Sequence, residues 1–183
     1  MNRDSAISLI REKVKNKNLI KHMLATESIM AALAVHFGED ANLWGLAGLV
    51  HDIDYDLTLN DPDQHGRLGA RMLEEAGADP VIIQAVKAHG PAYGQPRLSR
   101  IDTSLFAADP LSGLIVAAAL VHPQKKLAVL DTSFILKRFQ EKWFAKGANR
   151  EQILACEQVE LKLDEFIDLG LKAMQGISGE LGL

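Results

Sequence analysis

A histidine and an aspartate, His51 and Asp52, follow directly on the apolar run Leu46–Val50. Two strongly polar side chains at the end of an apolar segment are costly to bury unless they are paired, and a metal ion suits both. Further residues of the same types are His22, His65, His89 and Asp109. Imidazole and carboxylate together favour Mn, Fe, Zn, Co or Ni over Ca or Mg, which prefer oxygen ligands alone. The sequence therefore predicts a divalent transition-metal site.

Helices are expected to position these residues. Hydrophobic residues make up 48% of the chain and aromatic residues only 5%, with Ala, Leu and Ile prominent, which favours an all-α fold. Apolar spacing predicts helices over 5–15, 19–37, 40–50, 64–75, 79–88, 111–121, 133–145 and 150–174, with a further helix capped by Asp102 and a loop over 52–63. Four candidate ligands then come from three helical regions, and His65 and His89 stand at helix ends.

Asp52 can bridge two ions spaced by about 3.5 to 4 Å, an arrangement that suits attack on phosphorus. The order of the candidate ligands, over about residues 18–120, resembles the H…HD…H…H…D pattern of the HD superfamily of metal-dependent phosphohydrolases. His22 matches the first histidine, His51 and Asp52 the doublet, His65 and His89 the second-ion histidines of dinuclear members, and Asp109 the closing aspartate. The context AADPLSG around Asp109 is also similar to that of the family's last ligand.

The resemblance implies an all-α HD-domain bundle of about five core helices. A single domain over 1–183 is expected, with a metal-binding core at about 18–120 and a helical extension at about 121–175. Many bacterial members continue the doublet with Ile-Gly, whereas this chain has Ile53 and Asp54. In several branches a residue shortly after the doublet transfers protons or contacts substrate. The resemblance therefore implies catalytic roles for Asp52 and for Asp54, with Asp56 as an alternative to Asp54.

Cationic side chains are candidates for holding phosphate oxygens, since ions leave part of a substrate's charge unmatched. The predicted substrate-binding residues are Arg67, Lys125 and Lys126. Comparable cations are Arg71, Lys137, Arg138 and Lys142, and each of these residues could equally belong to an ordinary solvated surface.

The leading hypothesis is a phosphohydrolase in which two divalent ions lower the pKa of a water molecule that attacks a phosphate ester. No Walker-type loop, GxSxG elbow or dinucleotide fingerprint occurs in the sequence. Two alternatives stay open: a di-iron oxygenase, as in some relatives with these six ligands, and a non-catalytic regulatory domain that binds metal or nucleotide.

The formal charge of −4 gives no basic excess, so we expect a small phosphorylated substrate, a nucleotide first, and no polymeric nucleic acid. The longest apolar stretch, 111–121, is too short to cross a bilayer, and we expect no membrane partner. A lone Cys156 and the lack of an apolar leader favour the reducing cytoplasm. The C-terminal helices could form a homodimer or pack on the core.

Overall fold

The fold is all-α, as predicted, in the computed structural model, which describes residues 1–90 and 96–183. No strand occurs within these two ranges. The helices are α1 (Arg3–Lys13), α2 (Lys17–Phe37), α3 (Ala41–Val50), α4 (Tyr55–Thr58), α5 (Arg67–Glu75), α6 (Pro80–His89), α7 (Arg100–Val121), α8 (Thr132–Gln140), α9 (Arg150–Ile153), α10 (Leu163–Gly176) and α11 (Ser178–Leu181). Short 3-10 segments lie at Pro62–Gln64, Leu127–Val129 and Leu154–Val159.

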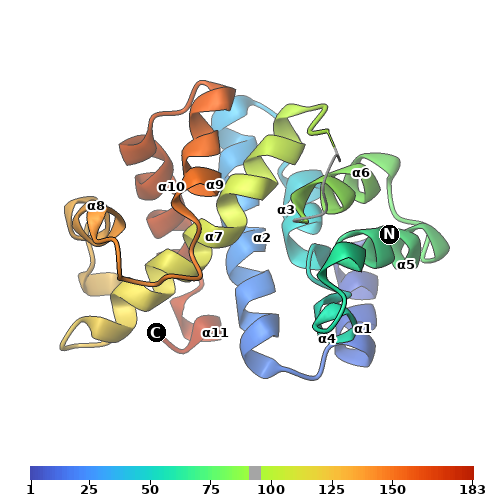
Figure 1. The fold of residues 1–183 in the computed structure, drawn as a ribbon, viewed down its shortest axis with the longest axis horizontal. Coiled ribbons are helices and arrows are strands. Elements are labelled where there is room, and N and C mark those ends of the chain that lie inside the picture. The colour runs from blue at the N-terminus through green and yellow to red at the C-terminus, as the bar shows by residue number, and fades with distance from the viewer. Residues whose placement is uncertain (91–95) are drawn as a thin grey trace.

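Two long helices, α2 and α7, cross at the middle of the molecule (Figure 1). Helices α3, α5 and α6 lie on one side of this crossing, and α8 and α10 lie on the other. Helix α2 packs against α3, α7 and α10, while α6 packs against α3, α5 and α7. By length and composition α7 could span a membrane, but most of its apolar window is buried in the bundle, as expected of a core helix.

Several predicted boundaries were wrong, for local reasons. The two helices expected on either side of Pro110 form one helix, α7, because packing of its many buried residues outweighs the hydrogen bond that proline cannot donate. Asp102 lies one turn inside α7, where its carboxylate accepts from the backbone N–H of Ser99, the N-cap. The expected helix over 150–174 is broken at Glu160, whose φ is 64°. The expected loop over 52–63 contains the short helix α4.

The backbones of α2 and α3 touch at Gly48. A Cβ atom there would lie 2.7 Å from the carbonyl oxygen of Thr26, too close for any other residue type. His22 precedes Thr26 by one turn, and His51 follows Gly48 by three residues. The close approach therefore brings two candidate ligands from different helices to one place, with their Nε2 atoms 3.1 Å apart.

Gly48→Ala should destabilise the protein, because the added methyl group meets backbone rather than a flexible side chain. We expect a loss of about 1 to 3 kcal/mol in the free energy of unfolding, measured by urea denaturation. Gly45→Ala on the same helix is the matched control, since its Cβ would make an ordinary contact at 3.5 Å with Ala31. Alanine should there be neutral or stabilising. Equal stability of the two variants would contradict the close approach.

Candidate metal centre

Four histidine rings direct their Nε2 atoms at the carboxylate of Asp52. Its Oδ2 lies 3.4 Å from Nε2 of His22 and 3.4 Å from Nε2 of His51. Its Oδ1 lies 3.3 Å from Nε2 of His65 and 3.5 Å from Nε2 of His89. One carboxylate thus faces a pair of imidazoles with each of its oxygens.

Asp109 completes the half of the cluster that contains His22 and His51. Its Oδ1 lies 3.1 Å from Nε2 of His22 and 3.9 Å from Nε2 of His51. The residue sits in the middle of α7, and its contact with His22 connects that helix with α2. The structure therefore brings all six predicted ligands together, from the three helices α2, α6 and α7 and from the segments that follow α3 and Pro62–Gln64.

Two of the rings are oriented by their own helices. Nδ1 of His51 donates to the carbonyl of Gly48 at 2.8 Å, and Nδ1 of His89 donates to the carbonyl of Val86 at 2.6 Å. A carbonyl oxygen can only accept, so each Nδ1 carries a proton, and Nε2 is the ring atom left to bind a metal.

The other two rings are oriented by side chains. Nδ1 of His65 donates to Oδ1 of Asp54 at 2.9 Å. The Ser112 hydroxyl donates to the carbonyl of Asp109 at 3.0 Å, so its oxygen accepts from Nδ1 of His22 at 2.8 Å. Ser112 was not among the residues predicted from the sequence, although its spacing of three from Asp109 on one helix face was a usable signal.

The donor set fits a divalent cation. Nε2 of His89 is buried and has no hydrogen-bond partner within residues 1–90 and 96–183. Ligands of one ion at about 2.1 Å lie about 3.0 to 3.4 Å from one another, close to most separations in this cluster. Two groups able to hold an ion are His22, His51 and Asp109, and His51, Asp52 and His89. The chemistry of the set, imidazole nitrogens together with carboxylate oxygens, favours a transition metal.

The carboxylates raise the pKa of their histidine partners. Burial alone lowers the pKa of His22, but contacts with Asp109 and Asp52 outweigh burial and raise the pKa to about 10. The same balance, with Asp52 and Asp54 as partners, raises the pKa of His65 to about 10. The pKa of Asp52 falls well below its usual range despite burial, because histidines surround it. Without a cation, protons therefore neutralise the cluster, and metal binding must displace them.

The metal-free protein should lose stability as the pH rises from about 6.5 to about 10. A histidine whose pKa rises from 6.5 in the unfolded chain to about 10 in the fold stabilises the protein fully below pH 6.5, and this contribution disappears as the pH passes the folded value. Thermal unfolding in a chelator across this range measures the decline. His22→Gln should flatten it, whereas His36→Gln, at the other end of α2, should not. The same decline in both variants would contradict the assignment.

Asp54 lies behind His65 and is fully buried. Its Oδ2 accepts from the backbone N–H groups of Gly66, at 2.9 Å, and Gly69, at 2.7 Å, while its Oδ1 accepts from His65. A Cβ at Gly69 would lie 3.2 Å from the Asp54 carboxyl carbon, so glycine leaves room for the contact. These bonds hold His65 in place. A direct catalytic role for Asp54, or for Asp56, stays a prediction.

Asp54→Asn should weaken metal binding at His65. The amide oxygen can still accept from the two glycines, which leaves the amide N–H₂ facing Nδ1 of His65. That nitrogen must then accept, so the proton moves to Nε2 and the ring can no longer ligate. We expect metal affinity to fall about 10- to 100-fold at this half of the cluster, measured by calorimetric titration with Mn²⁺. Asp61→Asn, an exposed change nearby, is the control; equal affinity of both variants would contradict the role of Asp54.

The three predicted substrate-binding cations lie in different surroundings. Arg67 begins α5, two residues after His65, and its Nε is buried without a hydrogen-bond partner in the described parts of the chain. Lys125 and Lys126 are exposed in the turn after α7. The end of that helix lies about 18 Å along its axis from Asp109. Only Arg67 is thus carried by an element next to the cluster, and the substrate roles of all three stay predictions.

Comparison with protein-family models gives one match, described as the HD domain, over residues 19–119. The chain belongs to the HD domain family. The match includes all six residues of the cluster and ends before α8. In this HD domain, the family and the His/Asp groups together indicate binding of a divalent metal.

Curated relatives of the HD domain include several proteins named Ribonuclease Y. The protein from Campylobacter jejuni is 33% identical over 126 residues, 68% of this chain and 22% of the relative. Ribonuclease Y 2 from Pediococcus pentosaceus is 31% identical over 98 residues, 53% and 18% of the two chains. Ribonuclease Y from Opitutus terrae is 31% identical over 74 residues, 40% and 14%. The matches thus span about a fifth of the relatives or less. No solved structure matches the chain.

These relatives correct the expected partners. A small phosphorylated substrate, a nucleotide first, and no polymeric nucleic acid were predicted from the sequence, but the relatives are named for action on RNA. The prediction rested on a net charge of −4 for the whole chain. Net charge shows neither where cations gather on a surface nor the charge that bound ions add at a site, so it could not exclude a polymeric nucleic acid.

Proposed function

We propose that this HD domain hydrolyses phosphodiester bonds of RNA with two divalent ions held at the His/Asp cluster. The observation that carries the proposal is the single carboxylate of Asp52, with a pair of imidazoles at each oxygen. Such a carboxylate suits a bridge between two cations. When bound, the ions lower the pKa of water and offset the negative charge of a phosphate. The names of the curated relatives support RNA as the polymer.

The substrate is expected to approach from the side of His22 and Asp109. Their side chains are 24% and 30% exposed, whereas those of His51 and His89 are 0% and 1% exposed. A cavity of about 450 Å³ lies on the same side, against His22. The buried side of the cluster therefore holds the ligands, and the exposed side is left for the phosphate.

The cavity beside His22 can hold the part of the substrate next to the scissile phosphate. Its lining combines polar and apolar side chains: Asn18, Lys21, Val116, Leu120, Leu181 and Leu183. The Lys21 ammonium donates to the carbonyl of Leu181 at 2.7 Å, and an ammonium has two further donors for phosphate or ribose oxygens. The apolar wall suits the face of a base or sugar. In the proposed reaction, water adds to phosphorus while the P–O bond to the leaving nucleotide breaks, giving a phosphate end and a hydroxyl end.

Metal-loaded protein should cleave an end-labelled single-stranded RNA. Mn²⁺, Fe²⁺, Co²⁺, Ni²⁺ and Zn²⁺ are tested separately, with products resolved by electrophoresis. Asp52→Ala removes the bridging carboxylate and should lower both bound metal and cleavage at least about 100-fold. The exposed Asp61→Asn variant, purified in parallel, should keep both.

Two results would overturn the proposal. One is intact RNA with every metal although two ions are bound. The other is cleavage that persists unchanged in Asp52→Ala, since the activity would then come from another site or a contaminating nuclease.

A further inference from the structure

Cationic residues concentrate in one segment outside the matched HD domain. Residues 137–150 carry five lysines and arginines and a single carboxylate, a formal charge of +4 within a chain of −4. The carboxylate, Glu141, forms a salt bridge with Arg138 at 2.7 Å. No salt bridge involves Lys142 or Lys146 in the part of the chain that the structure describes. The surface around these two lysines is therefore positively charged.

An indole ring is exposed at the centre of this segment. The side chain of Trp143 is 72% exposed, whereas the chain's other tryptophan, Trp44, is 3% exposed. The ammonium of Lys146 lies 4.3 Å from the centre of the Trp143 ring, and that of Lys142 lies 5.7 Å from it. Both distances are in the range of cation–π contacts.

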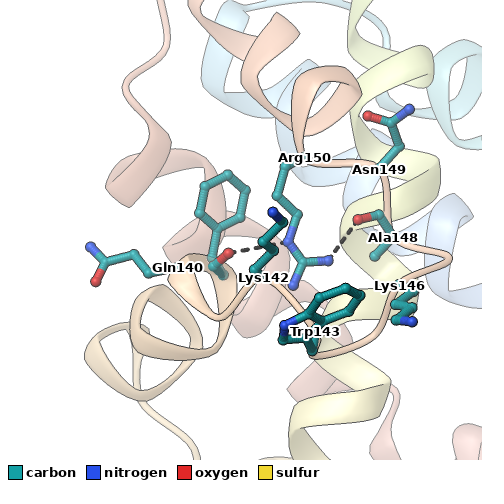
Figure 2. A pocket seen from close by; sticks show the side chains of 8 residues that line it. Gln140, Lys142, Trp143, Lys146, Ala148, Asn149 and Arg150 are labelled. Carbon is teal, nitrogen blue, oxygen red and sulfur yellow. Dashed lines mark hydrogen bonds between the residues drawn. The ribbon is translucent and has the colours of Figure 1, made fainter.

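A cavity of about 450 Å³ adjoins the ring (Figure 2). Besides Trp143 and the two lysines, it is lined by Phe139, Gln140, Ala148, Asn149 and Arg150. The site thus combines an exposed aromatic ring, cationic side chains and amide groups.

The loop that presents the indole is held firmly by Arg150. Its guanidinium donates to five backbone carbonyls, those of Arg138, Phe139, Phe144, Ala145 and Ala148, at 2.6 to 3.3 Å. These bonds hold the chain in its turn at Ala145, whose φ is 44°. A ligand that stacks on Trp143 therefore meets a preformed surface and need not order the loop.

We propose that Trp143, Lys142 and Lys146 form a binding platform for single-stranded RNA, separate from the metal centre. A base stacks on the indole, and the lysine ammonium groups move from the ring to the neighbouring phosphates. Proteins that bind single-stranded nucleic acid without sequence preference combine aromatic side chains, on which bases stack, with cationic side chains along the phosphate backbone. The positive charge of the segment favours a polyanion over a neutral or basic partner.

The platform rests on the proposed function in taking RNA as the ligand, and its place in the fold suits that role. Helix α8, which leads into the platform, packs against α7, and α7 carries Asp109 of the metal centre. An RNA strand bound at Trp143 is therefore held next to α8, which packs against α7, the helix that carries Asp109. The platform would retain the polymer near the cluster between cleavage events.

Binding of a fluorescein-labelled oligoadenylate RNA, measured by anisotropy, tests the platform in the full chain. Trp143→Ala should weaken binding about 10-fold or more, and Trp143→Phe, which keeps a stacking face, should recover most of it. Lys146→Ala should weaken binding and reduce its dependence on salt, whereas Lys162→Ala, an exposed lysine at the start of α10, should not. With unlabelled RNA, the tryptophan emission should be quenched in the wild type but not in Trp143→Phe, where only the buried Trp44 emits.

Measuring binding with Asp52→Ala separates this proposal from the proposed function. RNA that binds through Trp143 but is never cleaved supports the platform and overturns the function. If the wild type cleaves RNA but Trp143→Ala binds RNA as tightly as the wild type, the proposed function is supported and the platform is overturned. Absence of RNA binding by the wild type overturns the platform. So does a self-associating wild type that Trp143→Ala converts to a monomer without change in RNA affinity, because the indole would then belong to a protein interface.

Discussion

A buried carboxylate surrounded by four imidazole lone pairs is electrostatically unfavourable unless positive charge lies among them. The Nδ1 atoms of His22, His51, His65 and His89 all donate to neighbouring acceptors, so their Nε2 atoms are left to face Asp52. Protons can supply the missing charge, since contacts with the carboxylates raise the pKa of His22 and of His65. A divalent cation supplies the positive charge and accepts the Nε2 lone pairs as ligands. The fold therefore requires positive charge between Asp52 and the four histidines, and a bound metal ion would supply it.

The packing of the helices around the cluster fixes the distances between its ligands. The contact between α2 and α3 at Gly48 sets the distance between His22 and His51, and the crossing of α2 and α7 brings in Asp109. Asp54 ties the beginning of α5 to the residues after the doublet and so places His65. The same α7 then extends to the helices that present Trp143, so one rigid element adjoins both proposed sites. Chemistry and retention of the polymer would thus depend on one core helix.

Much of this arrangement could be predicted from the sequence, because its signals are local. Asp40 caps α3 and Gly38 ends α2 in the left-handed conformation, as residues of these types favour. The doublet after an apolar helix indicated a paired, buried site, and family resemblance ordered the remaining ligands. The contacts of Asp54 could not be predicted, since its partners Gly66 and Gly69 reach it only through the path of the intervening chain. The helix break at Glu160 could not be predicted either, because the apolar pattern continues across it. The expectation of no polymeric nucleic acid, which the names of the relatives contradict, rested on net charge, and net charge averages over a surface that is locally basic around Trp143.

The most direct test of the central claim is an anomalous difference map from crystals grown with Mn²⁺. The account predicts two strong peaks, one beside each oxygen of the Asp52 carboxylate, the first within reach of His22, His51 and Asp109 and the second within reach of His65 and His89. Crystals with no anomalous density at Asp52, or with manganese bound only elsewhere on the molecule, would contradict it.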